Sequence, residues 1–245
     1  MIETNFFQPE TGPKIAYRHT KGTGPMIVFL PGYMSDMTGS KAAALFDWAV
    51  ANNRSCLLLD YSGCGQSEGD FMDGTLSQWR DDVLALIDHI GAPKVILVGS
   101  SMGGWVMLLV GLALGERMSG MIGIAPAPDF TRWGFTDAQR DTIRDDGVLY
   151  QPNPYGAEPT PTWRGLYDDG VTHEILGADI AITCPVRVLQ GQADRDVPWK
   201  TALKLAQAVQ SNDVRVTLIK DGDHRLSRAG DVDLLLDAVA ELVGK

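Results

Sequence analysis

The sequence predicts an α/β fold with a mostly parallel central sheet, helices on both faces of that sheet and a small insertion that serves as a lid. Three observations lead to this prediction. Short apolar runs alternate with helical stretches along most of the chain. Their connections are short, and repeated strand–helix–strand units of this kind form parallel sheets. The alternation stops once, over about residues 126–183, where Pro, Trp, Tyr and Asp are frequent.

Local patterns predict the strands and helices of residues 2–98. Polar–apolar alternations over 2–8 and 14–19 flank the turn 9–12, which predicts an antiparallel hairpin. Two wholly apolar runs, 26–30 and 56–59, predict strands buried on both faces. Helices are expected over 38–51 and 76–90, and a further strand over 94–98.

The second half of the chain resumes the same alternation after the insertion. Strands are expected over 120–125, 186–190 and 214–219, and helices over 102–114, 200–210 and 228–243. Within the insertion, short helices are expected over 136–145 and 171–176. The chain is therefore divided into a core of residues 1–125 and 184–245 and a lid of residues 126–183. The lid is expected at the carboxyl ends of the strands, where open α/β sheets bind ligands.

Composition excludes several classes of function. The 245 residues carry a net charge of −10, which disfavours binding to nucleic acid or to an anionic membrane surface. The three cysteines, Cys56, Cys64 and Cys184, lack metal-ligand spacing and indicate a reducing environment. No signal peptide and no membrane-spanning apolar run is evident. We therefore expect a cytoplasmic protein with no metal, no cofactor, no nucleic-acid partner and no membrane insertion.

The strongest chemical signal is the motif Gly99-Ser100-Ser101-Met102-Gly103, directly after a predicted strand and directly before a predicted helix. A serine in this strand–turn–helix context is typical of a nucleophile held on a sharp bend. Glycines are needed on either side because side chains there would collide across the turn. Ser101 is therefore the predicted nucleophile, and the adjacent Ser100 is given a structural role.

A serine hydroxyl needs a neighbouring base, and the chain has only four histidines. His224 is the candidate because it follows the last strand and completes the order Ser, Asp, His. The orienting acid is expected in the loop Gly191–Pro198, where Asp194 and Asp196 compete. Asp194 is favoured, and Asp196 is better placed to cap the next helix.

Two backbone N–H groups are expected to bind the oxyanion of the tetrahedral intermediate. One belongs to Met102, which follows the nucleophile at a helix N-terminus. The other belongs to Tyr33, in the turn Pro31-Gly32-Tyr33 after the strand 26–30. The segment 60–67 is interpreted as a loop that braces this region.

These motifs resemble those of the α/β-hydrolase superfamily over nearly the whole chain. The segments 99–105, 189–199 and 222–228 are similar, more closely, to the abhydrolase-domain palmitoyl-protein thioesterases and mycophenolic-acid acyl-glucuronide esterases. The resemblance implies an α/β-hydrolase fold, the catalytic residues Ser101, Asp194 and His224, and a small-molecule acyl ester or thioester as substrate. It also implies a mitochondrial location, which is not carried over because the N-terminus is not transit-like.

The lid carries many aromatic residues, and these predict either an apolar acyl site or a small satellite core. The candidates for substrate contact are Met34, Trp133, Tyr155 and Trp163. The predicted function is that of a serine esterase or thioesterase. A peptidase or a carbon–carbon bond hydrolase with the same triad, and a ligand receptor that retains the triad, stay open as alternatives.

Overall fold

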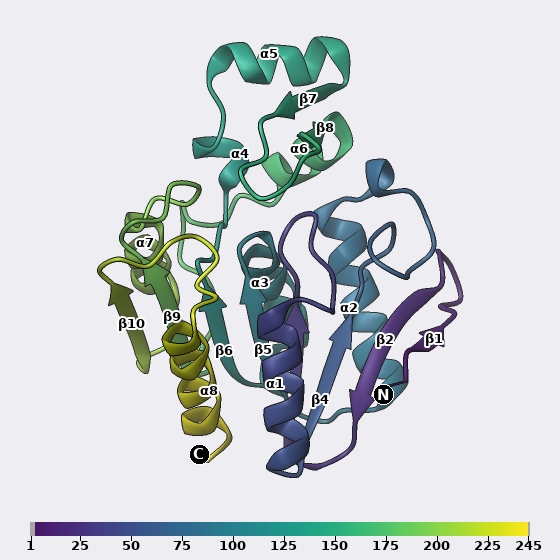
Figure 1. The fold of residues 1–245 in the computed structure, drawn as a ribbon, viewed down its shortest axis with the longest axis vertical. Helices are drawn as coiled ribbons and strands as arrows, with labels where there is room; N and C mark the ends of the chain where they lie inside the picture. The colour runs from purple at the N-terminus through teal and green to yellow at the C-terminus, as the bar shows by residue number, and fades with distance from the viewer. Residues whose placement is uncertain (1–2, 245) are drawn as a thin grey trace.

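The computed structural model describes residues 3–244 and contains a central sheet of eight strands in the order β1-β2-β4-β3-β5-β6-β9-β10 (Figure 1). Neighbouring strands from β4 to β10 run parallel, whereas β2 pairs antiparallel with both β1 and β4. The strands are β1 (Asn5–Phe7), β2 (Ile15–Thr20), β3 (Thr23–Leu30), β4 (Arg54–Leu59), β5 (Val95–Ser100), β6 (Met118–Ile124), β9 (Val186–Gly191) and β10 (Val214–Ile219). The predicted hairpin and parallel sheet are confirmed, although Ile2, at the predicted start of the first strand, lies outside the described residues.

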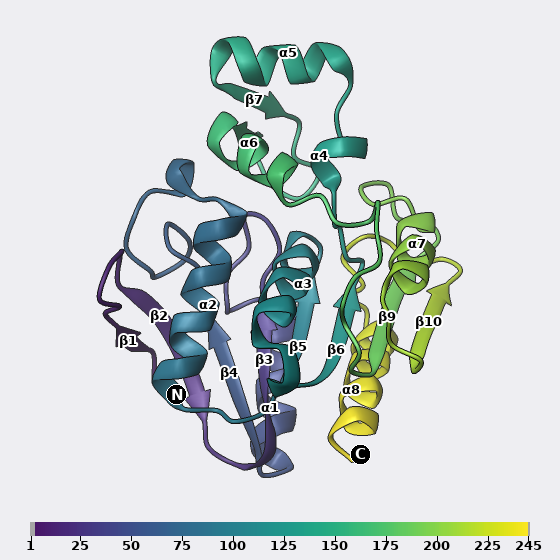
Figure 2. The same cartoon turned by 180° about the vertical axis from the view of Figure 1, so that it is seen from behind.

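Helices cover both faces of this sheet. Helices α1 (Ser40–Ala51) and α8 (Ala229–Val243) lie on the face seen in Figure 1. Figure 2 shows the opposite face, with α2 (Leu76–Ile90), α3 (Met102–Leu114) and α7 (Lys200–Ala208). The predicted layer arrangement is therefore confirmed.

Each face of the sheet has its own apolar core, and single strands contribute to both. Ile27 packs in the core under α1 and α8, whereas its neighbour Val28 packs in the core under α2 and α3. Successive side chains of a strand point to opposite faces, so a strand covered on both sides must be apolar at every position. This explains the unbroken apolar runs in the sequence.

Helix boundaries agree with the predicted ones where local signals are strong. Helix α2 begins after Thr75, whose hydroxyl accepts a hydrogen bond from the Gln78 N–H at 3.1 Å. It ends at Gly91, which adopts the left-handed conformation with φ 76°. Helix α3 also has the predicted limits.

The segment between β6 and β9 folds into small elements that stand over the carboxyl ends of the central strands (Figure 1). They are α4 (Phe130–Trp133), α5 (Asp137–Asp146), β7 (Val148–Gln151), β8 (Thr160–Trp163) and α6 (Arg164–Thr172). The predicted helix over 136–145 is found as α5, whereas the predicted helix over 171–176 is wrong. Helix α6 ends at Thr172, and the N–H groups of Ile175 and Leu176 donate instead to the buried Asp129 carboxylate, both at 2.8 Å.

Within residues 3–244, every helix is too short or too polar to cross a bilayer. The cysteines of this part of the chain are free thiols on buried residues, and Cys56 lies wholly inside the core, as predicted.

Candidate active site

Ser101 lies on the turn between β5 and α3 in a conformation that L-amino acids rarely adopt, with φ 54° and ψ −119°. Neighbouring glycines make this turn possible. A Cβ atom on Gly99 would lie 2.4 Å from the Gly103 carbonyl oxygen, and a Cβ on Gly103 would lie 2.3 Å from that of Leu30. The Ser101 N–H also donates to the Ile124 carbonyl at 2.9 Å, which fixes the turn against β6. The serine hydroxyl is thus presented at the carboxyl edge of the sheet.

Ser101, His224 and Asp194 are brought together at this edge from three separate loops. His224 Nε2 lies 3.0 Å from Ser101 Oγ, and His224 Nδ1 lies 3.0 Å from Asp194 Oδ2. Both distances are within hydrogen-bonding range, so the three side chains form one continuous chain of proton donors and acceptors. This arrangement matches the geometric requirement for a nucleophile, a base and an orienting acid.

The Asp194 carboxylate is held ionised by its surroundings. Its side chain is fully buried, and burial alone raises the pKa of a carboxyl group. The opposing effects, which are stronger in sum, are the hydrogen bond and charge of His224 and the N–H groups of Val197 and Asp196, both at 2.9 Å. The pKa of Asp194 is therefore lowered, and the carboxylate remains a hydrogen-bond acceptor toward His224.

The loop that carries His224 is fixed on both sides of the imidazole. The Ala193 N–H donates to the Gly222 carbonyl at 3.0 Å, which joins this loop to the one with Asp194. On the other side, the Lys41 ammonium at the start of α1 donates to the Arg225 carbonyl. Burial and then the Arg225 charge lower the pKa of Lys41 to about 8, although Asp223 and Asp231 oppose the shift. A cation in the first turn of a helix opposes the helix dipole, so the position of Lys41 reflects this tertiary contact.

Tyr33 and Met102 line the same cavity as Ser101. The turn that carries Tyr33 passes close to Ser101, because a Cβ atom on Gly32 would lie 3.3 Å from Ser101 Cβ. Met102 is the first residue of α3, where an N–H has no acceptor within the helix. Within residues 3–244, neither N–H donates to another protein group. Both are therefore free to bind a substrate oxygen.

The turn with Tyr33 is itself anchored to the insertion. The Tyr33 hydroxyl donates to the Pro161 carbonyl in β8 at 2.8 Å, and its ring packs on Phe71 with a centroid distance of 5.0 Å. From below, the Tyr61 hydroxyl donates to the Pro31 carbonyl at 3.2 Å. Tyr61 belongs to the segment 60–67, so the structure agrees with the bracing role expected of that loop.

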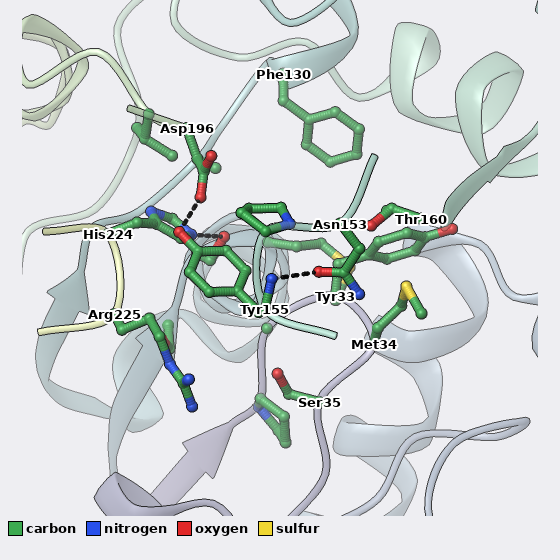
Figure 3. Close-up of a pocket in the computed structure, with 18 of the residues that line it drawn as sticks. Tyr33, Met34, Ser35, Phe130, Asn153, Tyr155, Thr160, Asp196, His224 and Arg225 are labelled. Atoms are coloured by element: carbon green, nitrogen blue, oxygen red, sulfur yellow. Dashed lines mark hydrogen bonds between the residues drawn. The ribbon is translucent and has the colours of Figure 1, made fainter. Parts of the chain in front are cut away.

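A cavity of about 690 Å³ opens beside Ser101, and its size is typical of small-molecule sites (Figure 3). The insertion contributes an apolar wall with Phe130, Trp133 and Leu166. The His224 side of the cavity is polar, with Lys41 and Arg225 among its lining residues. The cavity therefore offers both apolar and polar side chains to a bound molecule.

Three of the four predicted substrate contacts lie at this cavity, and one does not. Met34, Trp133 and Tyr155 line it. Trp163 does not, because it lies on β8 next to Thr162, which faces the cavity, and successive strand residues face opposite ways. Its ring packs instead against Tyr150, at a centroid distance of 6.2 Å. The structure therefore does not place Trp163 with the other three candidates.

Asp196, the rejected alternative for the acid, has a role that the sequence did not indicate. Its carboxylate accepts a hydrogen bond from the Tyr155 hydroxyl at 2.5 Å (Figure 3). The expected capping role is wrong, since the N-terminal boundary of α7 is Trp199 and no side chain caps it. The contact spans 41 positions in sequence, so no local pattern could reveal it.

Asp194, Asp196 and His224 also present ligand atoms within 4.8 Å of one another, a spacing that a cation could use. Asp194 Oδ2 and both ring nitrogens of His224 are already engaged in the hydrogen bonds that join these residues to each other and to Ser101. The arrangement is therefore better suited to proton transfer than to metal binding.

Comparison with known proteins gives a consistent family of relatives. The model of the alpha/beta hydrolase family matches residues 27–238. The human protein named palmitoyl-protein thioesterase ABHD10, mitochondrial, is 37% identical, over 95% of this chain and 78% of its own length. A putative hydrolase from Agrobacterium vitis has a TM-score of 0.94 and 39% identity, over 99% of both chains. The mouse alpha/beta hydrolase domain-containing protein 10 has a TM-score of 0.92 and 35% identity, over 99% of this chain and 98% of its own.

The expectation of a cytoplasmic location is corrected by these relatives. The human, orangutan and bovine proteins that match 95% of the chain are all named mitochondrial. The expectation rests on three cysteines without disulfide or metal-ligand spacing and on the lack of an evident signal peptide or bilayer-spanning run. Those features are shared by proteins of any reducing compartment, so they do not distinguish the cytoplasm from an organelle.

Proposed function

The chain belongs to the alpha/beta hydrolase family, and we propose that it is a serine hydrolase that cleaves carboxylic esters or thioesters of acyl groups through an acyl-enzyme on Ser101. The observation that carries the proposal is the continuous hydrogen-bond chain from Asp194 through His224 to Ser101, at a strained turn beside a cavity. Strain of this kind is retained in proteins where the conformation is used.

In the proposed first step, Ser101 Oγ attacks the acyl carbonyl carbon while His224 Nε2 takes the hydroxyl proton. The carbonyl oxygen becomes an oxyanion, which accepts hydrogen bonds from the N–H groups of Tyr33 and Met102. The bond to the leaving oxygen or sulfur then breaks, and the leaving group takes the proton from His224. The carboxylate of Asp194 keeps the imidazole in the required tautomer and stabilises its charged form.

In the second step, water replaces the leaving group at the same place. His224 takes a proton from this water, the hydroxide attacks the acyl-enzyme, and a second tetrahedral intermediate forms in the same oxyanion site. When the intermediate collapses, Ser101 recovers its proton and the carboxylic acid is released. The products are one acid and one alcohol or thiol.

We assign the acyl group to the apolar wall and give residues 126–183 the role of a lid over residues 1–125 and 184–245. Phe130, Trp133 and Leu166 come from this lid and face the cavity. The named thioesterase activity of the human relative supports a thioester of a long acyl chain as one substrate class. The insertion is in the position where open α/β sheets bind their ligands, which supports the same assignment.

A fluorophosphonate probe tests the nucleophile directly. The wild-type protein is expected to label covalently and to hydrolyse p-nitrophenyl acyl esters and acyl thioesters, whereas Ser101→Ala is expected to do neither. Ser100→Ala is the matched control, since this adjacent serine makes no hydrogen bond to His224, and it is expected to keep the labelling. Labelling of Ser101→Ala, or full turnover by it, would refute the proposal.

A further inference from the structure

The loop between β7 and β8 forms a strap over the catalytic cavity, and Tyr155 lies at its centre. Pro152, Asn153, Pro154 and Tyr155 line the cavity. The two prolines restrict the backbone, and the Tyr155 N–H donates to Asn153 Oδ1 at 2.9 Å, so the turn is fixed within its own sequence. The Tyr155 side chain is 50% exposed, so hydrophobic burial of the ring does not explain why it lies across the cavity.

Tyr155 is held by both loops that carry the catalytic side chains. Its hydroxyl donates to Asp196, which lies two residues after Asp194 in the same loop. The centroid of its ring lies 5.6 Å from the guanidinium of Arg225, the residue after His224. Figure 3 shows the Tyr155 side chain extending across the cavity toward Asp196 and His224. These contacts tie the strap to the polar side of the cavity.

This position determines which part of a substrate meets Tyr155. In the proposed function, His224 Nε2 returns its proton to the leaving atom, so the leaving group must lie on the His224 side of Ser101. Because Tyr155 closes that side, a small leaving group fits beneath the strap, whereas a large one must displace it. Displacement breaks the hydrogen bond with Asp196 and the contact with Arg225.

We propose that Tyr155 is a specificity-determining residue that selects substrates by the size of their leaving group, through its hydrogen bond to Asp196. The proposal rests on the proposed function, which assigns a place to the acyl group, and it adds a place for the leaving group. Esters and thioesters of small alcohols and thiols are accepted with the strap in place. An acylated peptide cysteine is accepted only after the strap is released, and weakening the anchor lowers that barrier.

The test compares two thioesters with the same hexanoyl group, one of ethanethiol and one of a cysteine-containing decapeptide. The measured quantity is the ratio of kcat/KM for the peptide thioester over the ethanethiol thioester. Tyr155→Phe and Asp196→Ala are each expected to raise this ratio about tenfold, a factor near the lower end of what one hydrogen bond to a charged group contributes. The double variant is expected to equal the single ones, because both remove the same contact.

Tyr150→Phe is the matched control, since Tyr150 belongs to the same insertion and is similarly exposed, but does not line the cavity. Its ratio is expected to equal that of the wild type. An unchanged ratio in Tyr155→Phe would overturn the proposal, and so would fully additive effects in the double variant. Failure of the proposed function is distinguished by the fluorophosphonate probe: without labelling of Ser101 the mechanism is wrong, whereas labelling with an unchanged ratio rejects the role of Tyr155 alone.

Discussion

The substitution Asp194→Asn changes the proton on His224 and leaves the shape of the site almost unaltered. Oδ1 of Asp194 accepts the N–H groups of Asp196 and Val197, and Oδ2 accepts Gln190 Nε2 at 2.9 Å and His224 Nδ1. An asparagine amide has one acceptor oxygen and one NH2 donor. Since backbone N–H groups cannot reverse their direction, the amide oxygen must take the place of Oδ1. The NH2 group then faces Gln190 and His224.

The new donor forces the wrong tautomer of the imidazole. His224 Nδ1 must become an acceptor for the NH2 group, so the ring proton moves to Nε2, the atom that should receive the Ser101 proton. The Gln190 side chain can adapt, because its Oε1 is buried without a hydrogen-bond partner in the described residues and can accept from the amide after a flip. The backbone therefore stays in place while the base is lost.

The expected loss in kcat is about 10⁴-fold, which corresponds to about 5.5 kcal/mol in activation free energy. KM is expected to change little, because Asp194 does not line the cavity. Steady-state hydrolysis of a p-nitrophenyl ester measures both. Asp221→Asn is the control, since its side chain is 80% exposed and forms an ion pair with Arg228, away from the cavity lining. A loss below tenfold in Asp194→Asn, with the fold intact by circular dichroism, would refute the assignment of the acid.

Two other substitutions test the surroundings of the site. Lys41→Met removes a cation whose pKa is lowered to about 8, below the unfolded value of about 10.4, so the unfolded state binds more protons between these values. The difference in unfolding free energy, wild type minus Lys41→Met, should then rise between pH 8 and pH 10 by up to about 1.4 kcal/mol per pH unit. Urea titrations at several pH values measure this difference, and a difference that does not change with pH would contradict the prediction. Leu166→Ala enlarges the cavity at the apolar wall and should cost about 2 kcal/mol in stability. It should also lower kcat/KM for an octanoyl ester about fivefold more than for an acetyl ester, and an equal loss for both esters would argue against an acyl contact.

The sequence predicts the parts of this molecule that depend on local patterns. Helices α2 and α3 have the predicted limits because Thr75, Gly91 and the Gly99–Gly103 turn are local signals. The central parallel strands β3, β4 and β5 are predicted because each contains an unbroken apolar run that is buried on both faces. The loops after β5, β9 and β10 meet at one edge for a topological reason, and this is why Ser101, Asp194 and His224 could be named as a group.

The parts that the sequence does not predict depend on contacts between distant segments. The hairpin of β7 and β8 was not predicted, because each strand has only four residues and β8 contains Pro161. The end of α6 is decided by Asp129, which lies 46 positions before Ile175 and draws its N–H group out of the predicted helix. The direction of Trp163 follows from the register of a strand that was not foreseen. In each case the deciding partner is remote in sequence.

The insertion is tied to the hydrolase core by polar contacts at several separate places. Tyr33 binds Pro161, Tyr155 binds Asp196, and Ser77 at the start of α2 binds the Asp169 carboxylate of α6 through both its N–H, at 2.9 Å, and its hydroxyl, at 2.7 Å. None of these contacts includes a side chain of the proposed triad. A change in the insertion can therefore alter the cavity walls without disturbing the distances among Ser101, His224 and Asp194. It follows that substrate preference can diverge between relatives that keep the same chemistry, and that comparisons of specificity should focus on the strap and its anchors.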